Sequence, residues 1–187
     1  EHFRYYRLAN AEAITLSGQV SIRWIENKMN GYLNRLLQTE KTDYVIASDT
    51  DSIYLNLGPV VDKFFGSKSN DKNKIVELLD KVCKDKLEPF IDASYEELAS
   101  YVKAYDQKMI MKRENIADRG IWTAKKRYIL NVWDSEGVRY KEPKMKIMGL
   151  ETARSSTPQY FRDKLYAAFQ IIIGKTNDEL ISFVNGV

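Results

Sequence analysis

Residues 44–57 have the sequence Tyr-Val-Ile-Ala-Ser-Asp-Thr-Asp-Ser-Ile-Tyr-Leu-Asn-Leu, in which an apolar run leads into two acids separated by one residue. After the acids, apolar and polar residues alternate. This pattern predicts a β-strand, a tight turn and a second β-strand. Because side chains two residues apart in extended backbone point the same way, Asp49 and Asp51 are expected to converge at the tip of this hairpin.

Two neighbouring carboxylates repel each other unless a cation lies between them. Magnesium suits such an all-oxygen site, since it binds through one or two carboxylates together with waters and substrate phosphates. Aspartate is also favoured in turns for its local hydrogen bonds to the backbone. From these residues alone, a magnesium site and a solvated turn are both open interpretations.

The composition limits the other kinds of chemistry. The chain has 187 residues, 44% of them hydrophobic, with Cys83 as its only cysteine and His2 as its only histidine. This length is enough for one core, and the residue types exclude a disulfide framework, Ser-His-Asp or Cys-His catalysis and Cys/His zinc sites. The lack of a long apolar run or a signal-peptide start predicts a soluble, cytoplasmic protein without membrane partners.

Helical and strand periodicities follow one another along the rest of the chain. We expect a long helix over residues 10–37, capped by Asn10 and closely packed at Gly18, and a loop over residues 58–70. Further helices are expected from Asp71, Pro89, Thr157 and Asn177, and strands over 109–116, 123–133 and 138–140, with a turn at 134–137. This order predicts an α+β fold, with an antiparallel sheet covered by helices on one face.

Basic charge is concentrated in one segment. Eight basic and three acidic residues lie between Arg119 and Lys146, although the whole chain has a net charge of only +3. A basic strand with interleaved aromatic residues suits contact with nucleic-acid phosphates. On a strand, Lys126 and Tyr128 would share one face and Lys125 and Arg127 the other. An exposed edge strand protected by lysines is the alternative interpretation.

Three motifs occur together in this chain, namely Asp49-Thr50-Asp51-Ser52, Lys125-Lys126-Arg127-Tyr128 and Lys146-Ile147-Met148-Gly149-Leu150-Glu151. The combination resembles the palm of family B DNA polymerases, in particular the replicative polymerases of T-even-type tailed phages. The likeness extends from Phe3 to about Pro158, and shorter matches include Phe3-Arg4-Tyr5-Tyr6, Trp24-Ile25, Asn34 and Ser155-Ser156-Thr157-Pro158.

The resemblance implies a DNA-directed DNA polymerase that uses two magnesium ions for template-directed nucleotidyl transfer from a dNTP. Asp51 would bind both ions, with Asp49 beside them as the second catalytic acid. Glu114 matches a nearby acid that helps to organise the metal site.

The resemblance also implies contacts to primer–template DNA. Lys126 would donate to the minor-groove edge of the terminal base pair, and Tyr128 would clamp the primer. Lys125 and Arg127 would have structural or backbone-contacting roles, and Lys146 with Gly149 would line the route to the thumb. Thr50, between the two acids, is included among the expected DNA contacts.

The resemblance divides the chain into residues 1–10 at the junction of fingers and palm, 11–150 as palm, and 151–187 as the beginning of a truncated helical thumb. Two family motifs, carrying the other essential acid and the triphosphate clamp, do not occur in this sequence. A Gly/Pro-rich family loop is reduced here to Asn115–Ile121. We therefore expect a polymerase segment in a phage-infected bacterium, inactive alone and completed by a second chain or by a missing N-terminal portion.

Two other classes remain as alternatives. An apolar strand followed by Asp-x-Asp also begins the phosphatases of haloacid-dehalogenase type, although those enzymes have a parallel sheet and a later pair of acids. A non-catalytic palm remnant that binds DNA or a protein is the third possibility, and large exposed apolar patches would then be expected.

Overall fold

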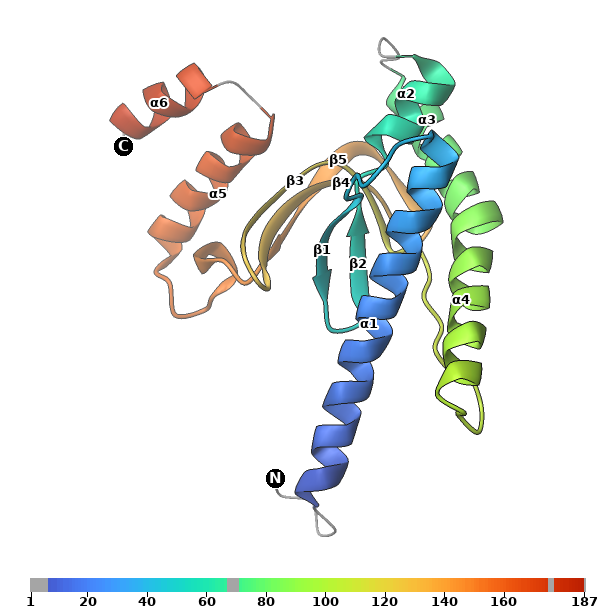
Figure 1. Ribbon diagram of the computed structural model, residues 1–187. Coiled ribbons are helices and arrows are strands. Elements are labelled where there is room, and N and C mark those ends of the chain that lie inside the picture. Colours follow the sequence, from blue (N-terminus) through green and yellow to red (C-terminus); the bar gives the residue numbers. More distant parts are fainter. Residues whose placement is uncertain (1–6, 67–70, 175–176, 187) are drawn as a thin grey trace. The chain divides into compact units, whose positions relative to one another are not determined.

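The computed structural model describes residues 7–66, 71–174 and 177–186. Within these ranges the chain is an α+β protein whose strands form two separate antiparallel sheets (Figure 1). It divides into two compact units, Glu1–Arg113 and Glu114–Val187. The predicted α+β class with antiparallel strands and packed helices is confirmed. Residues 1–6 of the fingers junction expected over residues 1–10, and residues 67–70 of the expected loop, lie outside the described residues.

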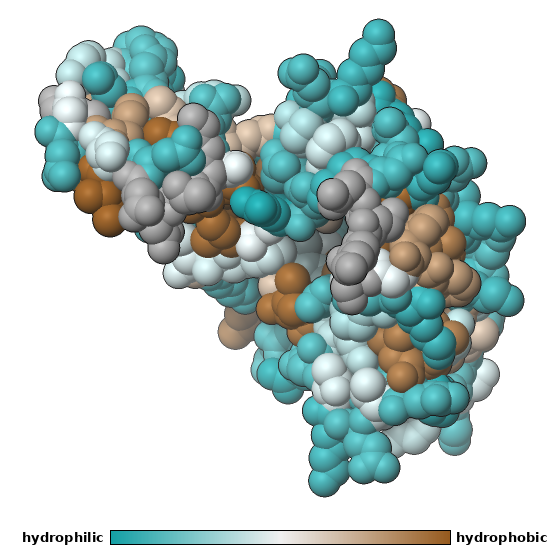
Figure 2. Space-filling model, turned by 90° about the horizontal axis from the view of Figure 1, so that it is seen from above, coloured by the Kyte–Doolittle hydropathy of each residue, from teal (hydrophilic) through white to brown (hydrophobic). Residues whose placement is uncertain are grey.

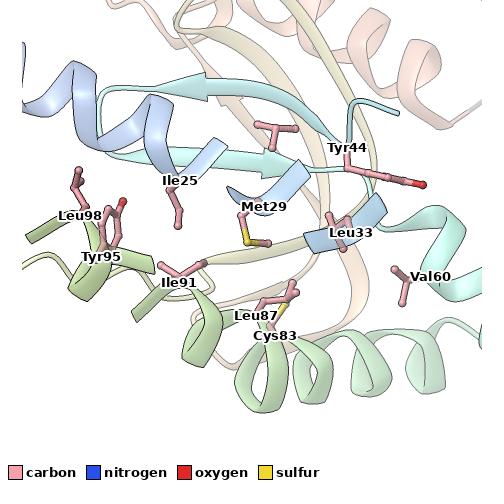
Figure 3. Packing of buried hydrophobic residues seen from close by; sticks show 11 residues of the cluster. Ile25, Met29, Leu33, Tyr44, Val60, Cys83, Leu87, Ile91, Tyr95 and Leu98 are labelled. Atoms are coloured by element: carbon pink, nitrogen blue, oxygen red, sulfur yellow. The ribbon is translucent and has the colours of Figure 1, made fainter. Parts of the chain in front are cut away.

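The first unit is built on a long helix that packs against a second helical run and a hairpin. Its elements are α1 (Leu8–Leu37), β1 (Val45–Asp49), β2 (Ser52–Leu55), α2 (Gly58–Phe65), α3 (Lys72–Val82), the π-helical turn η1 (Cys83–Leu87) and α4 (Glu88–Tyr101). Ile25, Met29 and Leu33 of α1 are fully buried at a spacing of four residues. They face Leu87 and apolar residues of α4 (Figure 3).

The first half of α1 differs from its prediction. The helix begins at Leu8, so Asn10 lies inside it and the predicted N-cap is wrong. A β-carbon at Gly18 would meet no described atom within 4 Å, so the predicted close packing there is also wrong. The described buried residues of α1 begin only at Ile25, because the hairpin and α4 pack along the second half of the helix.

The helices expected from Asp71 and Pro89 form one continuous helical run. Asp71 caps it as predicted, with its carboxylate accepting a hydrogen bond from the Lys74 N–H at 3.3 Å. At η1 the Glu88 N–H donates to the carbonyl of Cys83, five residues earlier. Pro89 has no N–H and its ring crowds the carbonyl four residues before it. The wider π turn accommodates this proline without ending the helix.

Two segments depart from the predicted strands and loops. Residues 58–65 form helix α2, whose first turn contains Pro59, a residue that fits a helix start. The strand predicted over 109–116 begins only at Asn115. The side-chain amide of Gln107 binds both the N–H and the carbonyl of Met109, so these groups are satisfied locally without a strand partner.

The second unit is a three-stranded antiparallel sheet with helices. Its elements are β3 (Asn115–Ala124), β4 (Arg127–Ser135), β5 (Val138–Met148), the 3₁₀ turn η2 (Glu151–Ala153), α5 (Gln159–Gly174) and α6 (Asn177–Asn185), with β4 in the centre of the sheet. The segment 115–121, expected as a shortened loop, is therefore strand. The turn expected over 134–137 is confirmed, and the Asp134 carboxylate accepts the Gly137 N–H at 3.0 Å.

Helix α5 packs on one face of this sheet. Phe169 and Ile173 contact a cluster that includes Ile129 of β4 and Ile147 of β5. The guanidinium of Arg119 donates to the carbonyl of Ile173 at 2.9 Å. Phe161, predicted on the buried side of α5, is 58% exposed, since the contacts with the sheet come from the C-terminal half of the helix.

Apolar side chains are also present at the surface, where Figure 2 shows hydrophobic groups among hydrophilic residues. The exposed ones include Leu8, Ile14 and Leu16 of α1, Phe64 of α2 and Tyr160 of α5. None of the helices formed by the described residues is both long enough and apolar enough to cross a membrane.

Candidate functional site

The acidic motif forms the tip of the β1–β2 hairpin. Asp49 pairs with Ser52, which leaves Thr50 and Asp51 as a two-residue loop. The predicted strand, turn and strand are confirmed. Hairpin loops of this length favour φ above zero at their first residue, and Thr50 has φ of 47°. This value is unusual for a β-branched residue, so the hairpin holds Thr50 in a conformation that glycine or asparagine would adopt more easily.

The two acids occupy different positions in the hairpin. Asp49 ends β1 and is half-buried, whereas Asp51 lies in the turn and is exposed. Strand alternation does not apply to Asp51, because the backbone reverses at this residue, and the convergence of the two carboxylates stays a prediction. The Asp51 N–H donates to the Asp49 carbonyl at 2.5 Å. The Thr50 hydroxyl donates to the Asp49 carboxylate at 3.1 Å, and the Ser52 hydroxyl donates to the Asp49 carbonyl at 3.2 Å.

The start of the hairpin is anchored by Asn30 of α1. Its side-chain oxygen accepts hydrogen bonds from the N–H groups of Tyr44 at 2.8 Å and Val45 at 3.0 Å. Its amide nitrogen donates to the carboxylate of Asp43 at 2.7 Å. These bonds join the long helix to the first residue of β1, so α1 fixes where the acidic hairpin begins.

Asn34, one helical turn further on, holds the loop before the hairpin. Its amide group accepts the Thr42 N–H at 3.0 Å and donates to the Thr42 carbonyl at 2.7 Å. It also accepts the Thr39 hydroxyl at 2.9 Å. Sequence reasoning missed both anchoring roles. The available signal was a pair of asparagines four residues apart beside the buried stripe of α1.

The donor set at the hairpin tip consists of Asp49 and Asp51. Among the described residues, no group of three or more His, Cys, Asp or Glu side chains is gathered closely enough to hold a metal ion. Two carboxylates at an exposed tip fit an ion such as magnesium, which takes its remaining ligands from water and substrate phosphates. They do not form a closed structural metal site of the kind built from four protein ligands.

The basic motif lies in the second unit, at the turn between β3 and β4. Ala124 pairs with Arg127, so Lys125 and Lys126 form the turn and are both exposed. The predicted placement of these two lysines on a strand is wrong, and the rule of alternating faces does not apply to them. The chain reverses direction here, and Lys126 takes a left-handed conformation with φ of 61°.

Arg127 and Tyr128, which follow the turn, are held by the second unit. The Arg127 guanidinium donates to the Glu151 carboxylate at 2.5 Å. A hydrogen bond from the backbone N–H of Glu151, and then the Arg127 guanidinium, lower the pKa of Glu151. Tyr128 is buried, with its ring 6.3 Å from that of Trp122 on β3. The sequence indicates Trp122 only as an aromatic residue within the basic segment.

Glu114 and Lys146 lie in the second unit with the basic turn, whereas Asp49 and Asp51 belong to the first. The Lys146 ammonium is 3.7 Å from the Glu114 carboxylate, and these side chains are 37% and 67% exposed. That Glu114 supports the acidic pair, and that Lys126 lies near it, both stay predictions.

Two curated proteins are similar to most of this chain, although no protein-family model matches it. The DNA-directed DNA polymerase of Escherichia phage RB69 is 49% identical over 165 residues, which cover 84% of this chain. The DNA-directed DNA polymerase of Enterobacteria phage T4 is 43% identical over 180 residues, or 92% of this chain. The matches cover only 18% and 20% of the two relatives, so the chain spans about a fifth of their length. The chain belongs to the DNA polymerase family of T-even-type phages, in which it corresponds to one segment of the longer proteins.

Proposed function

We propose that this chain is the part of a DNA-directed DNA polymerase that presents catalytic acids and primer contacts, within a palm and the first helices of a thumb. The observation that carries the proposal is the acidic hairpin, where Asp49 at the end of β1 and Asp51 in the two-residue loop flank Thr50, and where Asn30 anchors the start of β1. The similarity to the two phage polymerases supports the same reaction. The antiparallel hairpin argues against the phosphatase alternative, which needs a parallel sheet.

Asp51 and Asp49 are the proposed ligands of divalent ions, with magnesium as the expected metal and two ions in the complete enzyme. When bound, such ions would activate the primer hydroxyl and neutralise the triphosphate. Asp51 is exposed and can approach the substrate phosphates directly. Asp49 is half-buried, and its carboxylate accepts a hydrogen bond from the Thr50 hydroxyl, which restrains the orientation of this carboxylate. Glu114 is proposed as a supporting acid.

Lys126 and Tyr128 are the proposed contacts to the end of the primer. The acceptors of the minor groove are nearly the same for every base pair, so a lysine at the tip of a turn can bind there without reading sequence. Tyr128 is proposed to support Lys126 from the adjoining strand. Lys125, Arg127, Thr50 and Lys146 are the further proposed DNA contacts, with Arg127 tied to Glu151.

Nucleotide addition is proposed to require the remainder of a full-length polymerase, because the relatives are about five times as long as this chain. That remainder would carry the exonuclease, the fingers and the other catalytic acid, in the same polypeptide or in a second one. Residues 11–150 are proposed as palm and residues from 151 as the start of the thumb.

Primer extension by the chain completed with those segments tests the proposal. Asp51→Ala should lower the rate of nucleotide addition at least about a thousandfold, because it removes a metal ligand at the reacting phosphate. Asp92→Ala is the matched control, since Asp92 is an exposed acid on α4, and its rate should equal that of the wild type. An Asp51→Ala complex with wild-type activity would overturn the assignment and leave a DNA- or protein-binding remnant as the alternative.

A further inference from the structure

Gly149 lies directly against the backbone of Lys126. Its φ is 67°, and a β-carbon added there would lie 2.1 Å from the carbonyl oxygen of Lys126 and 3.2 Å from Cγ of Arg127. No side chain fits in this space, because the nearest atom is backbone and cannot rotate away. Glycine is therefore needed at position 149 for two reasons: the backbone is left-handed there, and it lies in contact with the turn.

Lys126 has an unfavourable backbone conformation, which the contact with Gly149 helps to maintain. In the β3–β4 turn Lys126 is the second loop residue, and its φ of 61° belongs to a region that favours glycine or asparagine. A lysine in this region is disfavoured by its own β-carbon. Such a conformation persists only when the surrounding structure holds it in place.

The residues that follow Gly149 hold the same turn. Leu150 is buried in the cluster that contains Ile129 of β4, and the Glu151 carboxylate accepts the hydrogen bond of Arg127 at 2.5 Å. We call residues 149–151 the clasp. Its three members contact the backbone of Lys126, the cluster around Ile129 and the side chain of Arg127, so the turn is held at Lys126 and on its C-terminal side.

We propose that the clasp, through Gly149, positions Lys126 for contact with the primer. The inference rests on the proposed function for the DNA contact, but the clasp itself can be tested without DNA. Gly149 is a positioning residue, since it acts through Lys126. Replacing it by alanine must push the Lys126 carbonyl away and thereby change where the lysine side chain leaves the turn.

The test compares Gly149→Ala with Gly137→Ala in the full 187-residue chain. Gly137 also has a left-handed φ, 88°, but a β-carbon there would meet no described atom within 4 Å. The two variants thus share the conformational penalty, and only Gly149→Ala adds the collision. If Gly149→Ala does not fold, Glu151→Gln weakens the clasp from its other end.

The first measurement is hydrogen–deuterium exchange of the free chain, followed in peptides that contain residues 123–128. The clasp predicts faster exchange there in Gly149→Ala, or in Glu151→Gln, and unchanged exchange in Gly137→Ala. Equal exchange in the clasp variant and the wild type would overturn the clasp, whatever the chain does with DNA.

The second measurement is affinity for a fluorescent primer–template duplex. Gly149→Ala and Lys126→Ala should each weaken binding about tenfold, as expected for one charge-assisted hydrogen bond. The double variant should be no weaker than either single one, because both changes act on one contact. Wild-type affinity in Gly149→Ala, or additive losses, would overturn the positioning role alone. Failure of the wild-type chain to bind the duplex would instead count against the proposed function and against any DNA role of the clasp.

Discussion

The side-chain oxygen of Asn30 accepts the backbone hydrogen bond of Val45 at 3.0 Å, so one residue of α1 fixes the start of β1. The same oxygen accepts the N–H of Tyr44 at 2.8 Å. Asn30→Ala should therefore lower the free energy of unfolding by about 1–2 kcal/mol, because the Tyr44 N–H loses this acceptor and the Val45 N–H keeps only its longer bond to the Asp43 carboxylate, at 3.2 Å. Urea denaturation of the chain measures this change.

Asn27→Ala is the control for this substitution. Asn27 lies on the same helix and is exposed, so its replacement by alanine should leave stability unchanged or raise it slightly through helix propensity. Equal effects of the two variants would show that the hairpin does not depend on Asn30.

Thr50→Gly should raise the free energy of unfolding by about 0.5 kcal/mol. Glycine adopts the left-handed φ of 47° without strain, and this gain should exceed the entropic cost of the greater freedom of glycine in the unfolded chain. If the threonine is retained for contact with DNA, the same variant should slow primer extension by the completed polymerase. Thermal unfolding and extension rates measured side by side check both parts. A loss of stability would mean that the Thr50 hydroxyl bond to Asp49 outweighs the backbone strain.

Asp80 and Arg113 should make the first unit sensitive to acid. Burial acts to raise the pKa of Asp80, but hydrogen bonds from Lys84 and Arg113 outweigh it, and the net effect lowers the pKa. A lowered folded pKa stabilises the fold above the unfolded carboxyl value of about 4, and this stabilisation is lost as the pH falls through the folded value. The Arg113 side chain is only 8% exposed, so its ion pair with Asp80 is largely shielded.

Asp80→Asn should therefore cost about 2–3 kcal/mol at pH 7, because it removes the negative charge that Asp80 places beside the largely shielded Arg113 guanidinium. Urea unfolding across a pH series should show this difference shrinking below about pH 4, where the wild-type carboxylate also becomes protonated. Asp92→Asn, on an exposed face of α4, should show no such dependence. A difference that stays constant down to pH 2 would contradict the role of the charge.

Cys83 should be inert in the folded chain. Burial raises the pKa of its thiol to about 11, so at pH 8 the reactive thiolate is almost absent. A colorimetric disulfide reagent should label the native chain slowly and the urea-denatured chain at once. Immediate labelling of the native chain would show that the π turn at Cys83 opens readily.

The acidic hairpin could be predicted because its signals are local. Alternating residues after Ser52 and two turn-forming residues specify a strand pair without reference to the remaining chain. The run Lys125-Lys126-Arg127-Tyr128 contains no turn residue, and its division into a turn and a strand follows from the pairing of Ala124 with Arg127. Likewise, the apolar residues from Met109 predict a strand. The side chain of Gln107 instead forms hydrogen bonds with the N–H and the carbonyl of Met109, the groups that would pair with a neighbouring strand.

Residue types and their spacing were enough to predict the α+β class and two acids at a turn, and the resemblance of three motifs to known polymerases indicated the family. Long-range contacts established the anchoring of the hairpin by Asn30 and the fit of Gly149 against Lys126, each made across more than ten residues of intervening chain. Periodicity reports which side of an element is apolar, and it carries no information about which distant backbone atom a side chain meets. That choice is made when the elements pack, because each buried donor then needs an acceptor and each close approach needs space.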